Sequence, residues 1–370
     1  MANRVHNIEY MRGLAMFGVI AIHVGSQAAE APAVLSPHLF LFLEIFSRFC
    51  VSLFFFVSAF GLFSSHPLDK PMAYGKYYKR RIEAVLIPYL VWSLFYIAVM
   101  PPITDPDELL SSIPWLLFFG IGAYHLYFMV ILIWFYIFFP LWRAFFARSD
   151  AFVFPAILLL FPLQYWFNQY STQVFSLSSV SDFWRPFFYY RLHTWPLHYL
   201  FPFFLGAFAA TRRTWWNRFI GRQHLFIVAF FAAAAYWLAS DYYALLATGA
   251  PLETAANTLQ QLSLPGSTFF VAATLLLYLI LAPSRLLQPL QQLFSYLSKH
   301  SYAVYLVHPL MLAGLDAWRV ANDLSYSTEI TLYVYFGTAL LSLAASMTFN
   351  ALSAFPLGGR ILGRLLLGKK

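Results

Sequence analysis

The sequence predicts an all-α polytopic membrane protein, a bundle of about ten transmembrane helices with both termini in the cytoplasm. Three observations support this fold class. Hydrophobic residues fill 61% of the 370 positions and charged residues only 10%, whereas soluble domains have about 45–50% and about 25%. Long apolar runs recur along the chain, and lysine and arginine gather in alternate connections between them. We interpret residues 1–370 as a single integral membrane domain.

The apolar runs are long enough to cross a membrane, since about 17–25 residues suffice for a hydrocarbon core of about 30 Å. The first run contains Arg12 and His23 and ends without a small-residue cleavage site, so it is expected to be a retained helix and not a signal peptide. In order along the chain, the predicted helices lie near 8–28, 39–64, 83–101, 123–145, 151–168, 195–211, 223–240, 267–284, 300–319 and 329–353.

The distribution of positive charge orients this bundle, because cytoplasmic loops of membrane proteins carry an excess of lysine and arginine. Most of the 23 such residues fall in one set of connections, together with both termini; the other set contains only Arg185, Arg191 and Arg319. The net charge of +8 then reflects topology and attraction to anionic lipid. We expect the plasma (inner) membrane as location, the lipid bilayer as a partner, and no nucleic acid.

The sequence offers little for metal or thiol chemistry. The single cysteine, Cys50, excludes an intrachain disulfide and a cysteine-based metal cluster. No HExxH pattern occurs, and His193 and His198 are five residues apart, which is not the helical spacing of paired metal ligands. We therefore expect no metal ion and no bound cofactor.

Ionisable side chains inside the predicted helices are the strongest indication of a functional site. Placing an arginine at the centre of a membrane helix costs about 2.5–3.5 kcal/mol on insertion scales, so such residues usually face the interior of the bundle and mark a site. Five positions stand out: Arg12, His23, Arg48, His125 and His308.

Arg12 and His23 share one face of the first helix. Eleven residues turn an α-helix through about 1100°, so both side chains point the same way, about 16 Å apart along the axis. Burial disfavours a charged imidazole, and a neutral His23 can accept a proton. Two simpler interpretations stay open, that Arg12 extends to the lipid headgroups and that His23 makes an interhelical hydrogen bond.

These residues also carry a resemblance to a known family. The stretch "NIEYMRGLAMFGVIAIH" (7–23) resembles the first helix of the acyltransferase-3 family of integral membrane O-acyltransferases, whose signature is an arginine, ten residues and a histidine. The chain departs from the family pattern at Glu9, where an aspartate is common, and at Ala84, where a second basic residue is common. Four further segments follow in the family's order, "RFCVSLFFFVSAFGLF" (48–63), "YYKRRIEAVLIPYLVWS" (77–93), "YHLYFMVILIWFYIFFP" (124–140) and "HSYAVYLVHP" (300–309).

The resemblance implies an enzyme that transfers an acyl group, commonly acetyl. The donor would be a cytoplasmic acyl-CoA such as acetyl-CoA, acting as a substrate. The acceptor would be a hydroxyl of a sugar, a lipid-linked glycan or a surface polysaccharide on the extracytoplasmic side. We therefore expect an O-acetyltransferase whose partners are acyl-CoA and a glycan.

Within this mechanism His23 is the expected general base. Arg12 is the second predicted catalytic residue and is expected to contact the donor or an acidic neighbour such as Glu9, since its guanidinium does not deprotonate. Arg48, His125 and His308 are expected to bind substrate, and for the two histidines a packing or hydrogen-bonding role is equally compatible with the sequence.

A basic cluster on the cytoplasmic side is expected to bind the phosphates of the donor, because ammonium and guanidinium groups pair with phosphate. The positive-inside bias of any membrane protein explains such a cluster equally well. Its members are Lys76, Lys79, Arg80 and Arg81.

The alternative function is a permease or flippase for a polar or glycan substrate, which would also place arginine, histidine and aromatic residues inside a bundle. No internal repeat of fixed period is evident in the sequence, which disfavours a transporter built from repeated halves. Turnover of a thioester donor separates the two functions.

Overall fold

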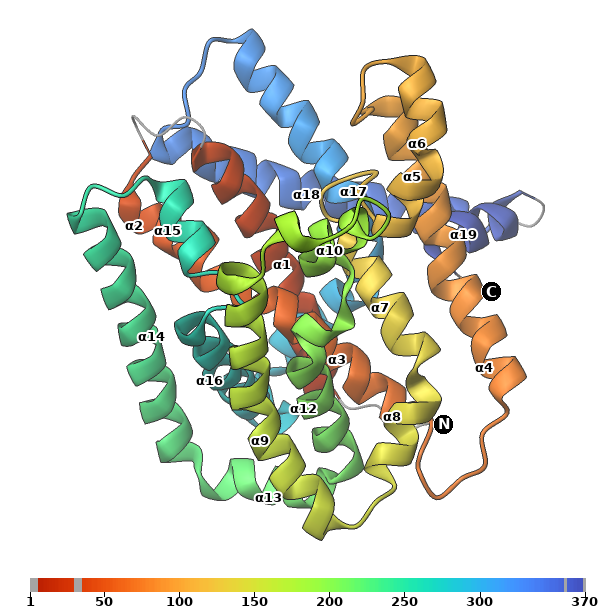
Figure 1. The fold of residues 1–370 in the computed structure, drawn as a ribbon, viewed down its shortest axis with the longest axis vertical. Helices are drawn as coiled ribbons and strands as arrows, with labels where there is room; N and C mark the ends of the chain where they lie inside the picture. The colour runs from red at the N-terminus through yellow and green to blue at the C-terminus, as the bar shows by residue number, and fades with distance from the viewer. Residues whose placement is uncertain (1–5, 30–34, 356–357, 369–370) are drawn as a thin grey trace. The chain divides into compact units, whose positions relative to one another are not determined.

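The computed structural model describes residues 6–29, 35–355 and 358–368, and these residues form helices and no strand (Figure 1). The predicted all-α class is confirmed. The chain forms two compact units, the first made of residues 1–67 and 201–346 and the second of residues 68–200 and 347–370.

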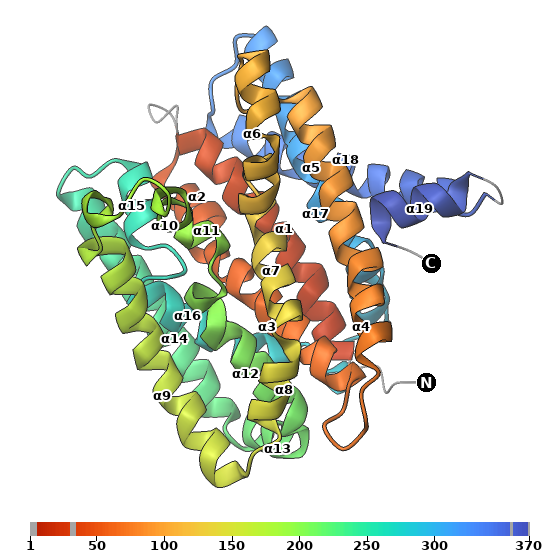
Figure 2. The same ribbon diagram turned by 45° about the vertical axis from the view of Figure 1, so that its right-hand side comes forward.

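In the first unit, helix α1 (His6–Ala29) lies against α3 (Phe49–Ser65), α16 (Leu264–Ile280) and α17 (Gln288–Ala321) (Figures 1 and 2). Apolar side chains of α1, α14, α16 and α17 form its buried core. Its other segments are α2 (Pro37–Phe40), the π-helical η1 (Leu41–Ile45), the 3-10 helix η2 (Phe46–Arg48), α12 (Leu200–Thr211), α13 (Arg213–Arg222), α14 (His224–Ala247), α15 (Leu252–Thr258), the 3-10 helix η7 (Pro283–Arg285) and α18 (Thr328–Leu352), which belongs to this unit as far as Ser346.

Two glycines of α1 allow its neighbours to approach closely. A Cβ atom at Gly13 would lie 2.9 Å from the carbonyl oxygen of Phe294 and 3.0 Å from the backbone nitrogen of Ser298, both on α17. At Gly25 it would lie 3.0 Å from the side chain of Glu44 on η1. Because glycine has no side chain, α17 and η1 reach α1 beside its predicted site residues.

The second unit contains a long helical segment in place of an expected loop. The basic cluster was expected in the connection between predicted helices, but Tyr74–Val99 is continuous. No glycine or proline interrupts it between Lys76 and Ile87, and the π-helical turn η3 precedes Pro88, whose ring lacks an N–H. The segments of this unit are α4 (Tyr74–Arg81), η3 (Ile82–Leu86), α5 (Ile87–Val99), α6 (Pro106–Phe119), α7 (Tyr127–Ile137), α8 (Phe139–Phe146), α9 (Asp150–Gln169), η4 (Tyr170–Val174), η5 (Leu177–Ser179), α10 (Arg185–Tyr189), α11 (Arg191–Thr194), η6 (Pro196–Tyr199) and α19 (Gly359–Leu367).

The helices agree with a multi-pass membrane protein. Within the described residues, six helical segments are long and apolar enough to cross a membrane, or seven if α7 and α8, which meet at 58°, count as one. The predicted number of ten and the cytoplasmic position of the termini are not confirmed by this count. Pro196–Thr211 and Leu264–Ile280 are apolar but shorter. The longer α17 is absent from the six, and it carries polar residues such as His300, His308 and Asp316.

Candidate functional site

Arg12 lies between α1 and α17 and is held by the second of these helices. Its Nε and Nη2 atoms both donate to the hydroxyl of Ser298, at 3.1 and 2.8 Å. The guanidinium reaches this hydroxyl because the two helices meet at Gly13, the next residue of α1. Arg12 is exposed and lines a pocket of about 730 Å³ together with polar side chains such as Glu9 and Lys299. The arginine therefore faces a polar pocket of the protein.

His23 lies on the same face of α1 as Arg12, eleven residues further along, and contacts a second histidine. Its ring is stacked on the ring of His308, with the ring centres 5.2 Å apart and the planes at 23°. His308 is fully buried, and its Nδ1 lies 2.8 Å from the carbonyl oxygen of Tyr305. A carbonyl only accepts hydrogen bonds, so Nδ1 carries the hydrogen and Nε2 is the accepting nitrogen. His23 is half-buried.

These contacts show that α1 and α17 run parallel. Arg12 meets Ser298, and His23, eleven residues later, meets His308, which follows Ser298 by ten. At a rise of about 1.5 Å per residue, the two polar levels are about 15–16 Å apart. The same pair of helices thus builds both the arginine level and the histidine level.

An ion pair lies near the histidine level. Arg48 and His308 both act electrostatically on His23. Glu44, which is entirely buried, accepts hydrogen bonds at Oε1 from Nε of Arg48 at 3.0 Å, from its Nη2, and from the hydroxyl of Ser26 at 3.1 Å. Since a carboxylate holds it from one side, the guanidinium has a fixed position.

The sequence interpretation missed Glu44. The signal was available, because a carboxylate four residues before an arginine on one helix is placed to pair with it. Glu44 belongs to the π-helical segment η1, and short π-helical turns inside helices are frequent at functional sites. Ser298 was also missed, because the predicted helix began at residue 300 and α17 begins at Gln288.

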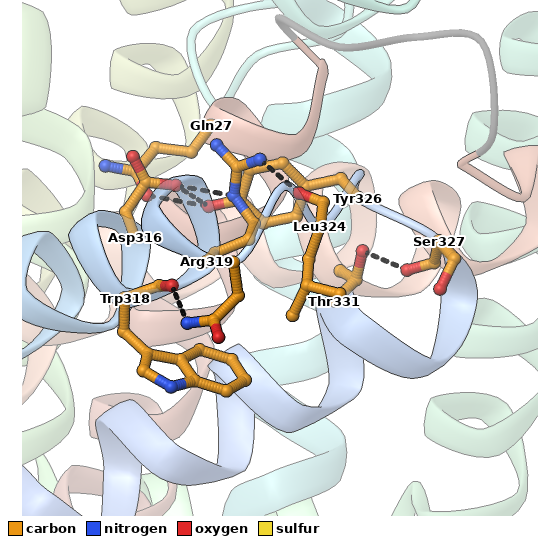
Figure 3. Close-up of polar contacts among 9 residues, drawn as sticks. Gln27, Asp316, Trp318, Arg319, Leu324, Tyr326, Ser327 and Thr331 are labelled. Carbon is orange, nitrogen blue, oxygen red and sulfur yellow. Dashed lines mark hydrogen bonds and ion pairs between the residues drawn. The ribbon is translucent and has the colours of Figure 1, made fainter.

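Hydrogen bonds join α1 and α17 through Tyr326, one helical turn beyond His23 (Figure 3). Asp316 accepts hydrogen bonds from Nε of Arg319 at 2.9 Å and from the hydroxyl of Tyr326 at 2.7 Å. That hydroxyl also lies 3.2 Å from the amide oxygen of Gln27 on α1, and the Arg319 guanidinium stacks on the Tyr326 ring at 4.2 Å. Burial and the neighbouring Asp316 raise the pKa of Tyr326, so its hydroxyl stays protonated.

The predicted donor-binding cluster lies in the second unit, on α4. Arg81 is half-buried, and its guanidinium carbon lies 5.4 Å from the ring centre of Tyr77 and 4.9 Å from that of Tyr136. These cation–π contacts give Arg81 a structural role. The side chains that stay exposed are Lys76, Lys79 and Arg80.

His125 also belongs to the second unit and is buried. Its ring meets the ring of Tyr96 edge to face at 5.2 Å and 79°, and that of Tyr124 at 5.7 Å. The structure therefore brings His308 and Arg48 to His23, and it places His125 among aromatic rings of its own unit.

Metal ligands do not cluster in the part of the chain that the structure describes: no group of three or more histidine, cysteine, aspartate or glutamate side chains there is arranged to hold a metal ion. The chemistry of the site described above consists of a proton acceptor, a fixed guanidinium and a polar pocket. Such groups suit proton transfer and the stabilisation of negative charge.

Comparison with known protein families finds a match that covers most of the chain. A family model described as an acyltransferase domain, the acyltransferase-3 model, matches residues 5–351. No curated protein and no solved structure matches the chain.

Proposed function

We propose that this chain, which belongs to the acyltransferase-3 family of membrane acyltransferases, transfers an acetyl group from cytoplasmic acetyl-CoA to a hydroxyl group. The acceptor in this proposal is a sugar of a lipid-linked or surface glycan outside the plasma (inner) membrane. One observation carries the proposal within the site: α1 and α17 together hold Arg12 beside a polar pocket and His23 on a second histidine at the next level.

In the proposed reaction, the acceptor hydroxyl oxygen attacks the carbonyl carbon of the thioester. His23 takes the hydroxyl proton as the new C–O bond forms. The tetrahedral intermediate then collapses, the C–S bond breaks, and the sulfur leaves with the electron pair of that bond. The protonated His23 returns its proton to the sulfur, so the products are an ester and free CoA.

The neighbouring groups assist this step in two ways. Arg48 is always charged and is held by Glu44, so it supplies a fixed positive charge near the developing oxyanion. His308 holds the imidazole plane of His23 by stacking on it. His308 is thus a positioning residue, and His125 has no role in this step.

Donor binding is assigned to the cytoplasmic side. Arg12 contacts the acyl-CoA in the polar pocket that it lines. In the second unit, considered by itself, the exposed members of the basic cluster on α4 carry positive charges that suit pairing with phosphate. Arg12, at the first level, lies about 16 Å from His23. An extended donor that enters by the first level would therefore carry its thioester toward the second.

The proposal is tested with purified protein in vesicles, supplied with radiolabelled acetyl-CoA and a glycan acceptor. Free CoA and a labelled ester are expected in equal amounts. Movement of unmodified glycan across the vesicle membrane without thioester cleavage would contradict the proposal and support a permease or flippase.

A further inference from the structure

A second pocket in the first unit carries two arginines that the reaction does not use. It measures about 380 Å³ and is lined by Arg213 at the start of α13, Arg285 of η7, and polar residues that include Asn217 and Ser284. It adjoins the Arg12 pocket, because His6 lines both.

The charges in this pocket are not balanced by neighbouring carboxylates. The described residues that line it include no aspartate or glutamate. Among the residues that the structure describes, none forms an ion pair with Arg213 or Arg285. The end of α16 brings the partial negative charge of a helix C-terminus to the pocket, about half a unit charge, and two full guanidinium charges outweigh it.

The wall of the pocket is ordered by hydrogen bonds. Tyr278 of α16 donates to Oδ1 of Asn217 at 2.8 Å and is also hydrogen-bonded to Asn7 of α1. With its oxygen engaged, the Asn217 amide keeps its NH₂ group as a donor. Arg213 acts electrostatically on Tyr278, which places its guanidinium close to this wall.

We propose that this pocket binds a phosphate ester. Two guanidinium groups bring positive charge to a small anion, and the NH₂ group of Asn217 and the hydroxyl of Ser284 can donate hydrogen bonds to it. Planar guanidinium groups also match the oxygens of phosphate. The identity of the ligand rests on the proposed function: the phosphate is that of the nucleotide end of acyl-CoA. The donor then lies with its 3′-phosphate at Arg213 and Arg285 and its acyl arm in the adjoining Arg12 pocket.

The test compares two double variants that each remove two positive charges from the same region. Arg213→Gln/Arg285→Gln changes the pocket, and Arg218→Gln/Arg222→Gln changes exposed residues of α13 that do not line it. The dissociation constants of CoA and of dephospho-CoA, which lacks the 3′-phosphate, are measured by calorimetry in nanodiscs. Thermal unfolding of both variants is measured alongside to confirm that they are folded.

We expect the pocket variant to bind CoA about 10- to 100-fold more weakly, as expected when charge-assisted hydrogen bonds are lost. Its affinity for dephospho-CoA should match that of the unchanged protein, and the control variant should bind both compounds normally. Equal CoA affinity of the two variants overturns the assignment to the donor.

Nanodiscs of phosphatidylcholine and of phosphatidylglycerol distinguish the source of the phosphate. The pocket variant could bind CoA normally and yet lose the rise in unfolding temperature that phosphatidylglycerol gives the unchanged protein. In that case the ligand is a lipid phosphate and not the donor. If the unchanged protein binds no CoA in either lipid, the proposed function fails, and the phosphatidylglycerol comparison still decides the pocket. Loss of neither CoA binding nor lipid stabilisation overturns the phosphate site.

Discussion

At the scale of single residues, His23 is the group on which the proposed chemistry depends. Replacing His23 by alanine is expected to lower kcat by about 10²- to 10⁴-fold, the usual contribution of a positioned proton acceptor. Turnover of acetyl-CoA by purified variant protein checks this, with the unfolding temperature as a measure of intact structure.

His224→Ala is the matched control, because His224 is exposed at the start of α14 and its Nδ1 lies 3.2 Å from the nearby carbonyl oxygen of Gly221, its one side-chain hydrogen bond among the described residues. It should turn over acetyl-CoA at the rate of the unchanged protein. A fully active His23→Ala enzyme would refute the mechanism.

Arg12 is expected to act through the shape of its guanidinium. Arg12→Lys keeps the charge but loses the two-atom grip on Ser298, so kcat/KM for acetyl-CoA should fall at least about tenfold, because lysine cannot replace the planar fork. Ser298→Ala should produce part of the same loss, since it removes the partner and leaves the arginine.

The measurement is steady-state kinetics at varied acetyl-CoA. Full activity of Arg12→Lys would make Arg12 an interfacial anchor that extends toward the headgroups.

The Glu44–Arg48 pair predicts a stability effect. Glu44→Gln leaves Arg48 without its charged partner, and breaking a buried ion pair from one side typically costs about 3–5 kcal/mol. Because Arg48 is only partly enclosed, with 16% of its side chain exposed, we expect the lower end of this range.

A double-mutant cycle with Arg48→Met measures the coupling by denaturant unfolding. The double variant should recover part of the stability and none of the acetyl transfer. Additive losses would show that the two residues stabilise the fold independently.

The sequence predicted some of these residues and not others for physical reasons. Helical periodicity alone places Arg12 and His23 on one face, and their unusual polarity marks them. Nothing in the sequence shows that His308 lies on His23, because that contact depends on how α17 packs against α1. Glu44 is different, since its spacing from Arg48 did indicate a pair and was overlooked.

At the scale of helices, the approach of α1 to α17 at Gly13 is the contact on which the arginine level depends. Gly13→Val places a branched side chain where a Cβ alone would be 2.9 Å from α17 backbone. Overpacking typically costs about 1–3 kcal/mol, and the displaced α17 should carry Ser298 away from Arg12. We expect lower thermal stability together with a lower kcat/KM.

Gly61→Ala is the control for this substitution. Gly61 lies within α3 and a Cβ there meets nothing within 4 Å, so alanine should be neutral or slightly stabilising through its better helix propensity. Unchanged activity and stability in Gly13→Val would show that α1 and α17 do not depend on this contact.

Helix boundaries were harder to predict than the helices themselves. The predicted helix at 329–353 agrees closely with α18, at Thr328–Leu352. The segment at 300–319 is part of the much longer α17, since residues 288–299 continue the helix and their polar side chains, such as Gln291 and Gln292, line the Arg12 pocket. Hydropathy finds the apolar part of a helix, and it does not find the polar turns that extend it.

At the scale of the whole molecule, topology is the prediction to test. Reporter fusions at both termini and between α3 and α4, at residue 70, should report a cytoplasmic location, because those connections carry the excess of lysine and arginine. Fusions near residues 104 and 180 should report the opposite side. A reporter at residue 70 that is active outside the cytoplasm would overturn the predicted orientation.

The fold class followed from composition and from the recurrence of apolar runs, whereas the number of crossings did not. Short helices such as Leu264–Ile280 and bent pairs such as α7 and α8 are ambiguous by length. The parallel direction of α1 and α17 is what the ten-helix prediction requires of its first and ninth helices, since helices separated by an even number of crossings point the same way. The division of the chain into two units depends on long-range packing and was not predicted.

The pairing of Arg12 with Ser298 has a consequence for how the protein is made. The two residues are 286 positions apart, and a ribosome adds about 5–20 residues per second, so α17 emerges about 15–60 s after α1. Throughout that interval α1 lies in the membrane with Arg12 and His23 on one face, and α17 is not yet packed against that face. A chain that ends before α17 keeps this face uncovered, and we expect membrane proteases to remove it faster than a chain that ends after α17.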